Sequence, residues 1–386
     1  MKIVLVFGGF GAFIGAIIGL DRFVGDRLRA VYDRNERWAF PTAFALFIGA
    51  ALLLPIFVGI VQEELAVLVA IYALLALGLN VVVGFAGLLD LGYVAFWAIG
   101  AYSYAVLSNS GDIQIPWNLS IWQVLPIAIA IALLAGVLLG APTLRLRGDY
   151  LAIVTLGFGE IVRIVAENLE GVTRGAKGII NIKPASVPFS GRPFSGDPDE
   201  YYFIAILFLA FMILIIRQLN RSRVGRYWAA IREDEEAAEA MGVPTLKYKL
   251  WAFAIGASTS GFAGVVYASR VAYISPSSFQ FIISITILAM VVLGGLGSIA
   301  GAMIGAAVIT VFPEVLRSLP DTFQESRYMI FGAALVVMMI FRPQGIIPSR
   351  RRAAELKGEV HEAVEVTPVV GEGTTDAAPE GADGAS

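Results

Sequence analysis

The sequence contains no cysteine and only one histidine, His361, which lies in a polar stretch near the C-terminus. A chain without cysteine forms no disulfide and offers no thiolate to zinc or to an iron–sulfur cluster. The apolar segments also lack the groups of histidine and carboxylate side chains that a metal-dependent membrane hydrolase needs. We therefore expect no metal site, and a membrane enzyme is the least favoured of the function classes.

Two further patterns are missing from the sequence. There is no Gly-x-x-x-x-Gly-Lys-Ser/Thr loop, and Gly175-Ala-Lys-Gly does not match that pattern. The basic residues also form no patch of the kind that binds nucleic acid. The sequence therefore predicts that any ATP chemistry takes place on another chain, and that nucleic acid is not a partner.

Charge is scarce as well. Charged residues make up 15% of the chain and hydrophobic residues 58%, whereas about a quarter of a soluble domain is charged. The charges cluster and leave repeated apolar runs close to the roughly 20 residues that cross a bilayer. The sequence thus predicts an all-α polytopic membrane protein in contact with membrane lipid.

Basic residues set the expected orientation of the spans. Cytoplasmic loops are rich in arginine and lysine, which places residues 21–37, Arg145, Arg147 and the loop 218–248 in the cytoplasm. The N-terminus then lies outside, the C-terminus lies inside, and residues 167–198 form an external loop. About 10–11 spans are expected, including 3–20, 38–60, 66–86, 119–141, 199–217, 249–271, 279–296 and 328–342.

The chain divides into three parts. Residues 1–37 hold an N-terminal span with its basic cytoplasmic loop, and residues 38–350 form the main transmembrane domain. Residues 351–386 are rich in alanine, glycine and glutamate and cannot bury enough apolar surface to offset their ordering entropy. We expect this last part to be a disordered, acidic cytoplasmic tail.

Glycine interrupts two apolar segments, at Gly84, Gly87 and Gly92 and again at 294–297. Backbone groups freed at such breaks must be buried in protein or line a wet cavity. If either break is re-entrant, the span count changes by one or two, and whether the shared Gly-x-x-Gly spacing marks an internal repeat stays open. The candidates for a substrate path are Asn80, Gly84, Gly87, Asp90, Thr155 and Gly157.

Two features carry charge or polarity among the spans. Glu160 and Arg163 are three residues apart near the outer end of a span, which favours a structural ion pair over a functional site. Residues 225–242 form a polar segment, predicted as one helix ended by Gly242. One face of this helix carries Trp228, Ile231, Ala238 and Met241, and the other carries Arg232, Glu233, Glu236 and Glu239.

The sequence Glu236-Ala237-Ala238, followed four residues later by Gly242, resembles the coupling loop of ABC importer permeases. Its wider context, with the blocks 77–102 and 145–163, is similar to the branched-chain amino acid permeases of the M type. Asp90 departs from that family's pattern, where a small polar residue such as serine is expected. Without the resemblance, a charged loop helix of this kind is equally well explained as a solvated surface.

The resemblance implies an ABC importer permease fold and an import function. In that family the coupling loop docks into an ATPase subunit, a role that here falls on Gly225, Arg232, Glu236, Ala237, Ala238 and Gly242. The implied partners are a second, H-type permease, two ABC ATPases that use ATP and Mg²⁺, and an extracytoplasmic solute-binding protein. No cofactor is expected on this chain, and the implied location is the bacterial cytoplasmic (inner) membrane.

The family's default substrates are leucine, isoleucine and valine, while urea, amides and other amino acids are alternatives within the same importer class. An ion-coupled secondary transporter is the competing hypothesis, because it needs an acidic residue deep in a span. Asp90 and Glu160 are the candidates for that role, and both lie near turns or span ends. The ABC importer permease is therefore the favoured reading.

Overall fold

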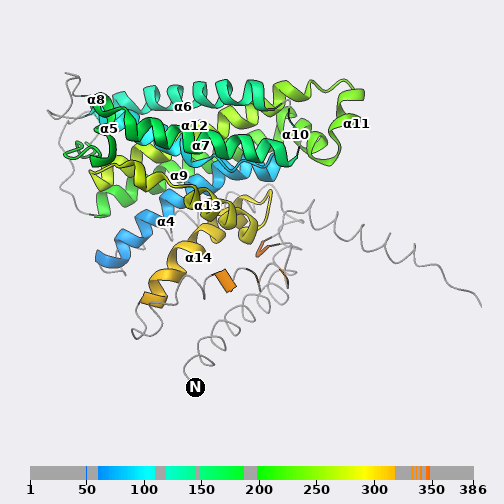
Figure 1. Cartoon of the computed structure of the whole chain (residues 1–386). Coiled ribbons are helices and arrows are strands. Elements are labelled where there is room, and N and C mark those ends of the chain that lie inside the picture. Colours follow the sequence, from blue (N-terminus) through cyan, green and yellow to red (C-terminus); the bar gives the residue numbers. More distant parts are fainter. Residues whose placement is uncertain are drawn as a thin grey trace, which may run out of the picture. The chain divides into compact units, whose positions relative to one another are not determined.

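The computed structural model describes residues 60–108, 119–144, 146, 148–186 and 198–317, together with 49, 332–333, 336, 340 and 345–347. The predicted segments 1–37 and 351–386, and most of the predicted spans 38–60 and 328–342, lie outside the described residues. Within the described part every regular element is a helix (Figure 1). Its β contact is an isolated bridge between Ile179 and Ile274.

Five described helical segments are long and apolar enough to cross a membrane. They lie in α4 (Ile60–Leu79) with its continuation η2 (Asn80–Phe85), α6 (Ile121–Thr143), α9 (Pro198–Arg221), α12 (Thr245–Val271), and η4 (Pro276–Phe279) with α13 (Phe281–Gly294). Two shorter apolar helices are α5 (Val94–Leu107) and α14 (Ile299–Arg317). The prediction of an all-α polytopic membrane protein is confirmed, whereas the full count of 10–11 spans includes segments outside the described residues.

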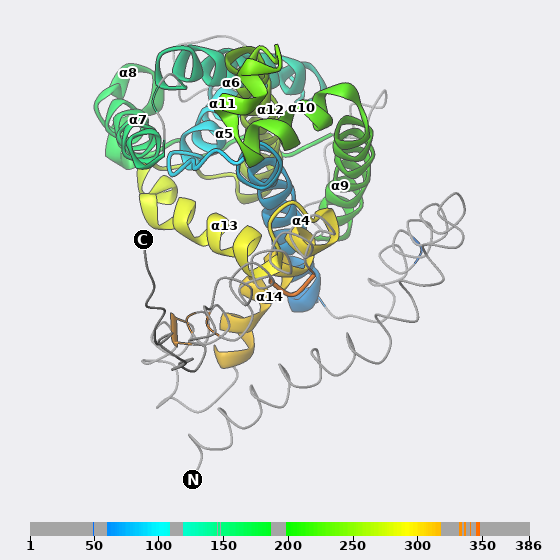
Figure 2. The same ribbon diagram turned by 90° about the vertical axis from the view of Figure 1, so that its right-hand side faces the viewer.

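The helix α7 (Asp149–Asn168) is as long as these spans but carries four charged residues. It runs beside the apolar helices and lies at one edge of the bundle, opposite α9 (Figure 2). The remaining elements are short. They are α8 (Glu170–Thr173), η3 (Gly175–Lys177), α10 (Arg223–Glu233) and α11 (Glu235–Ala240).

The long helix α12 forms the centre of the packing and contacts α4, α5 and α6. Its approach to α5 is so close that a Cβ on Gly100 would overlap the carbonyl of Gly261. Small residues at helix contacts let two backbones touch in a membrane, where van der Waals packing drives association. Around the same helix pair, the Trp97 ring packs against Tyr267 and Phe279, with centroids 4.7 and 5.0 Å away.

Both predicted glycine breaks are turns between helices. The first span ends as a π-helix at Phe85, and the chain passes through Gly87, with φ of 72°, before α5 begins at Val94. The second turn joins α13 to α14 through Gly295 and Gly297, whose φ angles are 122° and 75°. Positive φ at these positions requires glycine, since a Cβ would be strained there.

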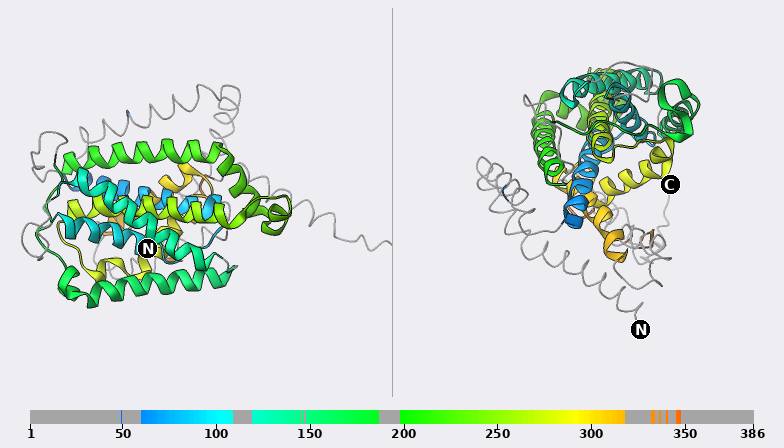
Figure 3. Two further views of the ribbon diagram at one scale, coloured as in Figure 1. Left: turned by 90° about the horizontal axis from the view of Figure 1, so that it is seen from above. Right: turned by 90° about the vertical axis from the view of Figure 1, so that its left-hand side faces the viewer.

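The bundle has two distinct ends (Figure 1). At the α10 end, α10 and α11 project beyond the long helices, as the view from above also shows (Figure 3). At the opposite, loop end, the described part of the loop 167–198 is attached to three helices, α5, α6 and α9. There the Tyr104 hydroxyl donates to the Lys183 carbonyl at 2.8 Å, the Trp122 indole donates to Ser186 at 2.7 Å, and the Tyr201 hydroxyl accepts from the Ala185 amide at 3.1 Å.

Candidate functional site

The polar segment 225–242 is broken at Asp234, so the prediction of a single helix is wrong. Asp234 has an extended backbone, with φ of −154° and ψ of 111°, and it ends α10 while it caps α11. Its carboxylate accepts hydrogen bonds from the amides of Glu236 and Ala237 at 2.9 and 3.0 Å. A short acidic side chain that captures nearby amides favours a helix start over a helix interior.

Most of the predicted apolar face of this segment is buried. Trp228 and Ile231 are buried, and so is Ala238, which was also predicted to belong to the coupling contact. The Trp228 indole donates to the Tyr248 carbonyl at 2.8 Å. Met241, predicted on the same face, is 85% exposed, because α11 ends at Ala240 and Met241 lies in the turn that follows it. The exposed residues of α11 and of the turn that follows it, here called the docking surface, are Glu236, Ala237, Glu239, Ala240, Met241 and Gly242.

Three of the predicted coupling residues, Gly225, Ala238 and Arg232, do not belong to that surface. Gly225 is buried, and a Cβ there would overlap the backbone of Asn220, so its role is close packing of α10 against α9. Gly242 is exposed with φ of 82° and meets open space, as expected for the residue that ends a helix. Ala238 is buried beneath the docking surface.

Arg232 was expected on the solvated face and instead points into the bundle. Its guanidinium donates to the carbonyl of Gly84, in the π-helix, at 2.6 Å. Carbonyls in the last turn of a helix lack intrahelical partners, so the arginine satisfies a group that the break leaves open. The fit is tight, because a Cβ on Gly87 would lie 2.8 Å from the Arg232 Cγ.

Asn80 joins the two glycine breaks. It is fully buried, its side-chain oxygen accepts from the Gly297 amide at 2.9 Å, and its amide group donates to the Ser298 carbonyl at 3.2 Å. Gly84 lies one turn away, and a Cβ there would overlap the Asn80 oxygen. Together these contacts form what we call the junction, which consists of Asn80, Gly84, Gly87, Arg232, Gly297 and Ser298.

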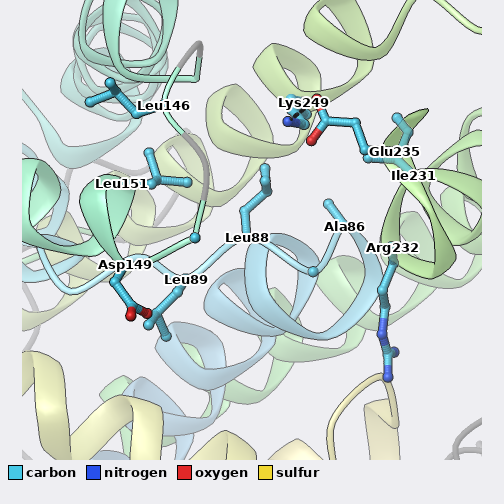
Figure 4. A pocket seen from close by; sticks show the side chains of 12 residues that line it. Ala86, Leu88, Leu89, Leu146, Asp149, Leu151, Ile231, Arg232, Glu235 and Lys249 are labelled. Carbon is cyan, nitrogen blue, oxygen red and sulfur yellow. Dashed lines mark ion pairs between the residues drawn. The ribbon is translucent and has the colours of Figure 1, made fainter. Parts of the chain in front are cut away.

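A cavity of about 210 Å³ lies beside the junction (Figure 4). It is smaller than the usual small-molecule pocket of about 300–1,000 Å³. Its polar wall includes an ion pair between Lys249, whose side chain is 3% exposed, and Glu235. A buried lysine needs such a partner. The lining residues are Ala86, Gly87, Leu88, Leu89, Leu146, Gly148, Asp149, Leu151, Ile231, Arg232, Glu235 and Lys249.

The remaining predicted path residues lie on the other side of the first break. Asp90 is fully buried and accepts from the Gly92 amide at 2.9 Å, while the Thr155 hydroxyl accepts from the Leu91 amide at 3.1 Å. The bond between Leu91 and Thr155 fastens the break to α7. Gly157 is separate from both groups, since nothing lies within 4 Å of a Cβ built on it. The six predicted path residues therefore do not line one common space.

The predicted ion pair between Glu160 and Arg163 is present, with the Arg163 Nε donating to a Glu160 oxygen at 2.9 Å. Glu167 also accepts from Arg163, at 2.9 Å, so the pair is part of a three-residue cluster. The sequence analysis did not predict this third residue. The i, i+4 spacing of Arg163 and Glu167 was the available signal. Arg163 is 25% exposed and both glutamate side chains are 43% exposed.

Apolar spans, two broken hairpins and a polar segment bonded to one of the breaks define a membrane protein of the permease class. The chain belongs to the family described as the permease component of branched-chain amino acid transport systems, whose family model matches residues 61–339. No solved structure matches the chain.

Curated relatives include both permease types of such systems. The high-affinity branched-chain amino acid transport system permease protein LivM of Escherichia coli K12 is 42% identical over 336 residues, which cover 81% of this chain and 77% of the relative. A probable LivM of Methanocaldococcus jannaschii is 27% identical over 59% of this chain and 69% of its own length. The permease protein LivH of Salmonella typhimurium is 26% identical over 72% of this chain and 91% of its own length.

The junction makes a testable prediction about stability. Replacing Asn80 with alanine leaves the Gly297 amide and the Ser298 carbonyl without that partner, at a cost of about 1–3 kcal/mol of unfolding free energy. The thermal unfolding midpoint of the detergent-solubilised protein should fall. Asn168→Ala is the matched control, because that exposed side chain bonds only to Ile164 of its own helix in the described contacts. Equal midpoints for the two variants would contradict the role given to Asn80.

Proposed function

We propose that this chain is a membrane-spanning permease subunit of an ABC importer that carries leucine, isoleucine and valine across the bacterial inner membrane. The family match and the named relatives support the transport system and its substrates. The observation that carries the mechanism is the hydrogen bond from Arg232 to Gly84. It links an exposed helical segment directly to the break in a span.

The docking surface is suited to a cleft in a partner ATPase. Ala237 and Ala240 are exposed and have small side chains, so another backbone can approach them closely. Met241 adds a flexible apolar contact next to them. In the proposed assembly ATP and Mg²⁺ are held by two ATPase subunits, and closure of their dimer moves α10 and α11.

The junction offers a route by which that motion reaches the spans. A shift of α10 displaces the Arg232 guanidinium and, with it, the carbonyl of Gly84. The π-helix that contains Gly84 is a type of element found mostly at functional sites. From there, Asn80 passes the displacement to the turn at 297–298, and so to α13 and α14. One movement outside the bundle thereby acts on both broken hairpins.

The remaining partners follow from the ends of the bundle. Relatives of both the LivM and LivH types resemble this chain, which supports a second, H-type permease beside it. The loop end is the proposed contact for an extracytoplasmic binding protein, because its bonds to three helices give a fixed surface. The arginines of α9 and α10 support a cytoplasmic α10 end, and in the proposed orientation the N-terminus is outside and the C-terminus inside.

The substrate class is tested by uptake of radiolabelled leucine into cells that express the chain with its partner permease, ATPases and binding protein. We expect uptake to require this chain and to be reduced by excess isoleucine or valine. Excess urea or acetamide should leave it unchanged. Competition by urea or the amide, without competition by isoleucine and valine, would instead favour the alternative substrates of this importer class.

The docking surface is tested at Gly242. Replacing it with tryptophan should abolish uptake while the protein stays in the membrane, because the bulky side chain blocks the contact with the ATPase. Gly242→Asn is the matched control, since asparagine tolerates the left-handed backbone, and it should retain uptake. If the tryptophan variant imports leucine normally, Gly242 lies outside the coupling contact.

The junction is tested by comparing uptake with ATP hydrolysis. Arg232→Ala should lower leucine uptake at least about tenfold while the assembled complex still hydrolyses ATP, because the docking surface is intact but its bond to the span is lost. Arg232→Lys keeps one charged donor and should recover part of the uptake. Parallel loss of uptake and hydrolysis, with no recovery by lysine, would show that Arg232 serves assembly instead.

A further inference from the structure

The charged residues of α7 all lie on one flank of the helix. Along an α-helix, residues that follow one another at intervals of four, three and four positions lie on the same face and form a stripe. Three neighbouring stripes can be traced on α7, each shifted by one residue in the sequence from the stripe before it. The first stripe packs into the bundle and contains Thr155, Gly159 and Ala166. The second, which we call the charged flank, consists of Leu156, Glu160, Arg163 and Glu167. The third consists of Gly157, Ile161, Ile164 and Asn168 and is largely exposed.

The charged flank lies at the depth of the membrane. The 20 residues of α7 span about 30 Å, and Glu160 is about 16 Å along the helix from its first residue. The helix stands at the edge of the bundle (Figure 2), and its three charged side chains are between 25% and 43% exposed. A charge that faces lipid at this depth is costly, so such residues face a bundle interior or a water-filled space.

The opposite flank of α7 has a different character. It carries Val154, Phe158 and Val165, and the Phe158 ring packs on Phe96 of α5 with centroids 5.7 Å apart. The charges are therefore segregated on one side of the helix.

The charged flank continues toward the cavity at the α10 end. Asp149 precedes Leu156 by seven residues and so lies on the same flank. It also lines the cavity, together with Arg232 and the ion pair of Lys249 and Glu235. The flank thus carries charge at both ends, at Glu160, Arg163 and Glu167 toward the loop end and at Asp149 beside the cavity, with the apolar Leu156 between them.

We propose that the charged flank of α7 lines the hydrated path of the amino acid, and that the cavity is the mouth of this path at the α10 end. The inference rests on the proposed import function. Carboxylates suit the ammonium group of a zwitterionic substrate, and the guanidinium suits its carboxylate. Arg163 is already paired with two glutamates, so these groups bind a substrate only weakly. Weak binding suits a transport path, because the substrate must also be released from it.

The natural sequence has no cysteine, so single cysteines can be placed without removing any other. Leu156→Cys puts a thiol on the charged flank, and Glu167→Cys puts a second one there while the bond between Glu160 and Arg163 remains. Ile161→Cys and Ile164→Cys are matched controls on the next stripe at similar depth. Each variant is assembled with its partner subunits in membranes and treated with a membrane-impermeant, positively charged methanethiosulfonate reagent.

Thiolate forms only where water reaches the sulfur, so reaction rate reports hydration. We expect Leu156→Cys and Glu167→Cys to react at least about tenfold faster than the two isoleucine variants. Modification of Leu156→Cys should also reduce leucine uptake, and treatment of the control variants should leave it unchanged. Equal or slower reaction on the charged flank would overturn the proposal and show that lipid or dry protein covers it.

Leucine uptake by each variant is measured before labelling, which distinguishes failure of the proposed path from failure of the proposed import function. Variants that import leucine but react slowly on the charged flank overturn the path and leave the proposed function standing. Absence of leucine uptake by the unmodified chain with its partners would overturn the proposed function itself, whatever the labelling rates.

Discussion

The interior of a bilayer contains no water to satisfy an unpaired carbonyl or amide, and this constraint governs how the two broken hairpins are built. Each break frees backbone groups, and each is satisfied by a side chain from a distant element. Arg232 serves the carbonyl of Gly84, Asn80 serves the turn at 297–298, and the Ser284 hydroxyl accepts from the Val94 amide at 3.0 Å. The breaks therefore act as fastening points between helices.

That arrangement explains why a polar segment outside the bundle can matter to the spans. A helix with complete internal hydrogen bonding would offer α10 no open carbonyl, and the two could interact only through side-chain packing. The open carbonyl of the π-helix gives Arg232 a directional bond, and Gly87 allows the arginine stem to lie against the backbone. Stability and proposed coupling thus depend on the same few contacts.

Much of the fold was predictable from sequence, because spans, glycine breaks and the buried positions Trp228 and Ile231 follow from hydropathy and helical spacing. The break at Asp234 was not, since its carboxylate competes with a helix that its neighbours favour. The direction of Arg232 depends on a carbonyl 148 residues away in the sequence. The partners of Asn80 are 217 and 218 residues away. Periodicity carries no information about contacts of that kind.

The close contact between Asn80 and Gly84 limits which substitutions this sequence can accept during evolution. A side chain at 84 would occupy the volume of the Asn80 oxygen, and aspartate or leucine at 80 would lose one or both of the bonds to the second turn. Neither position can change alone without loss. Among descendants of this chain, residues 80 and 84 should therefore be inherited as a linked pair, while the outward stripe of α7 varies freely among apolar residues.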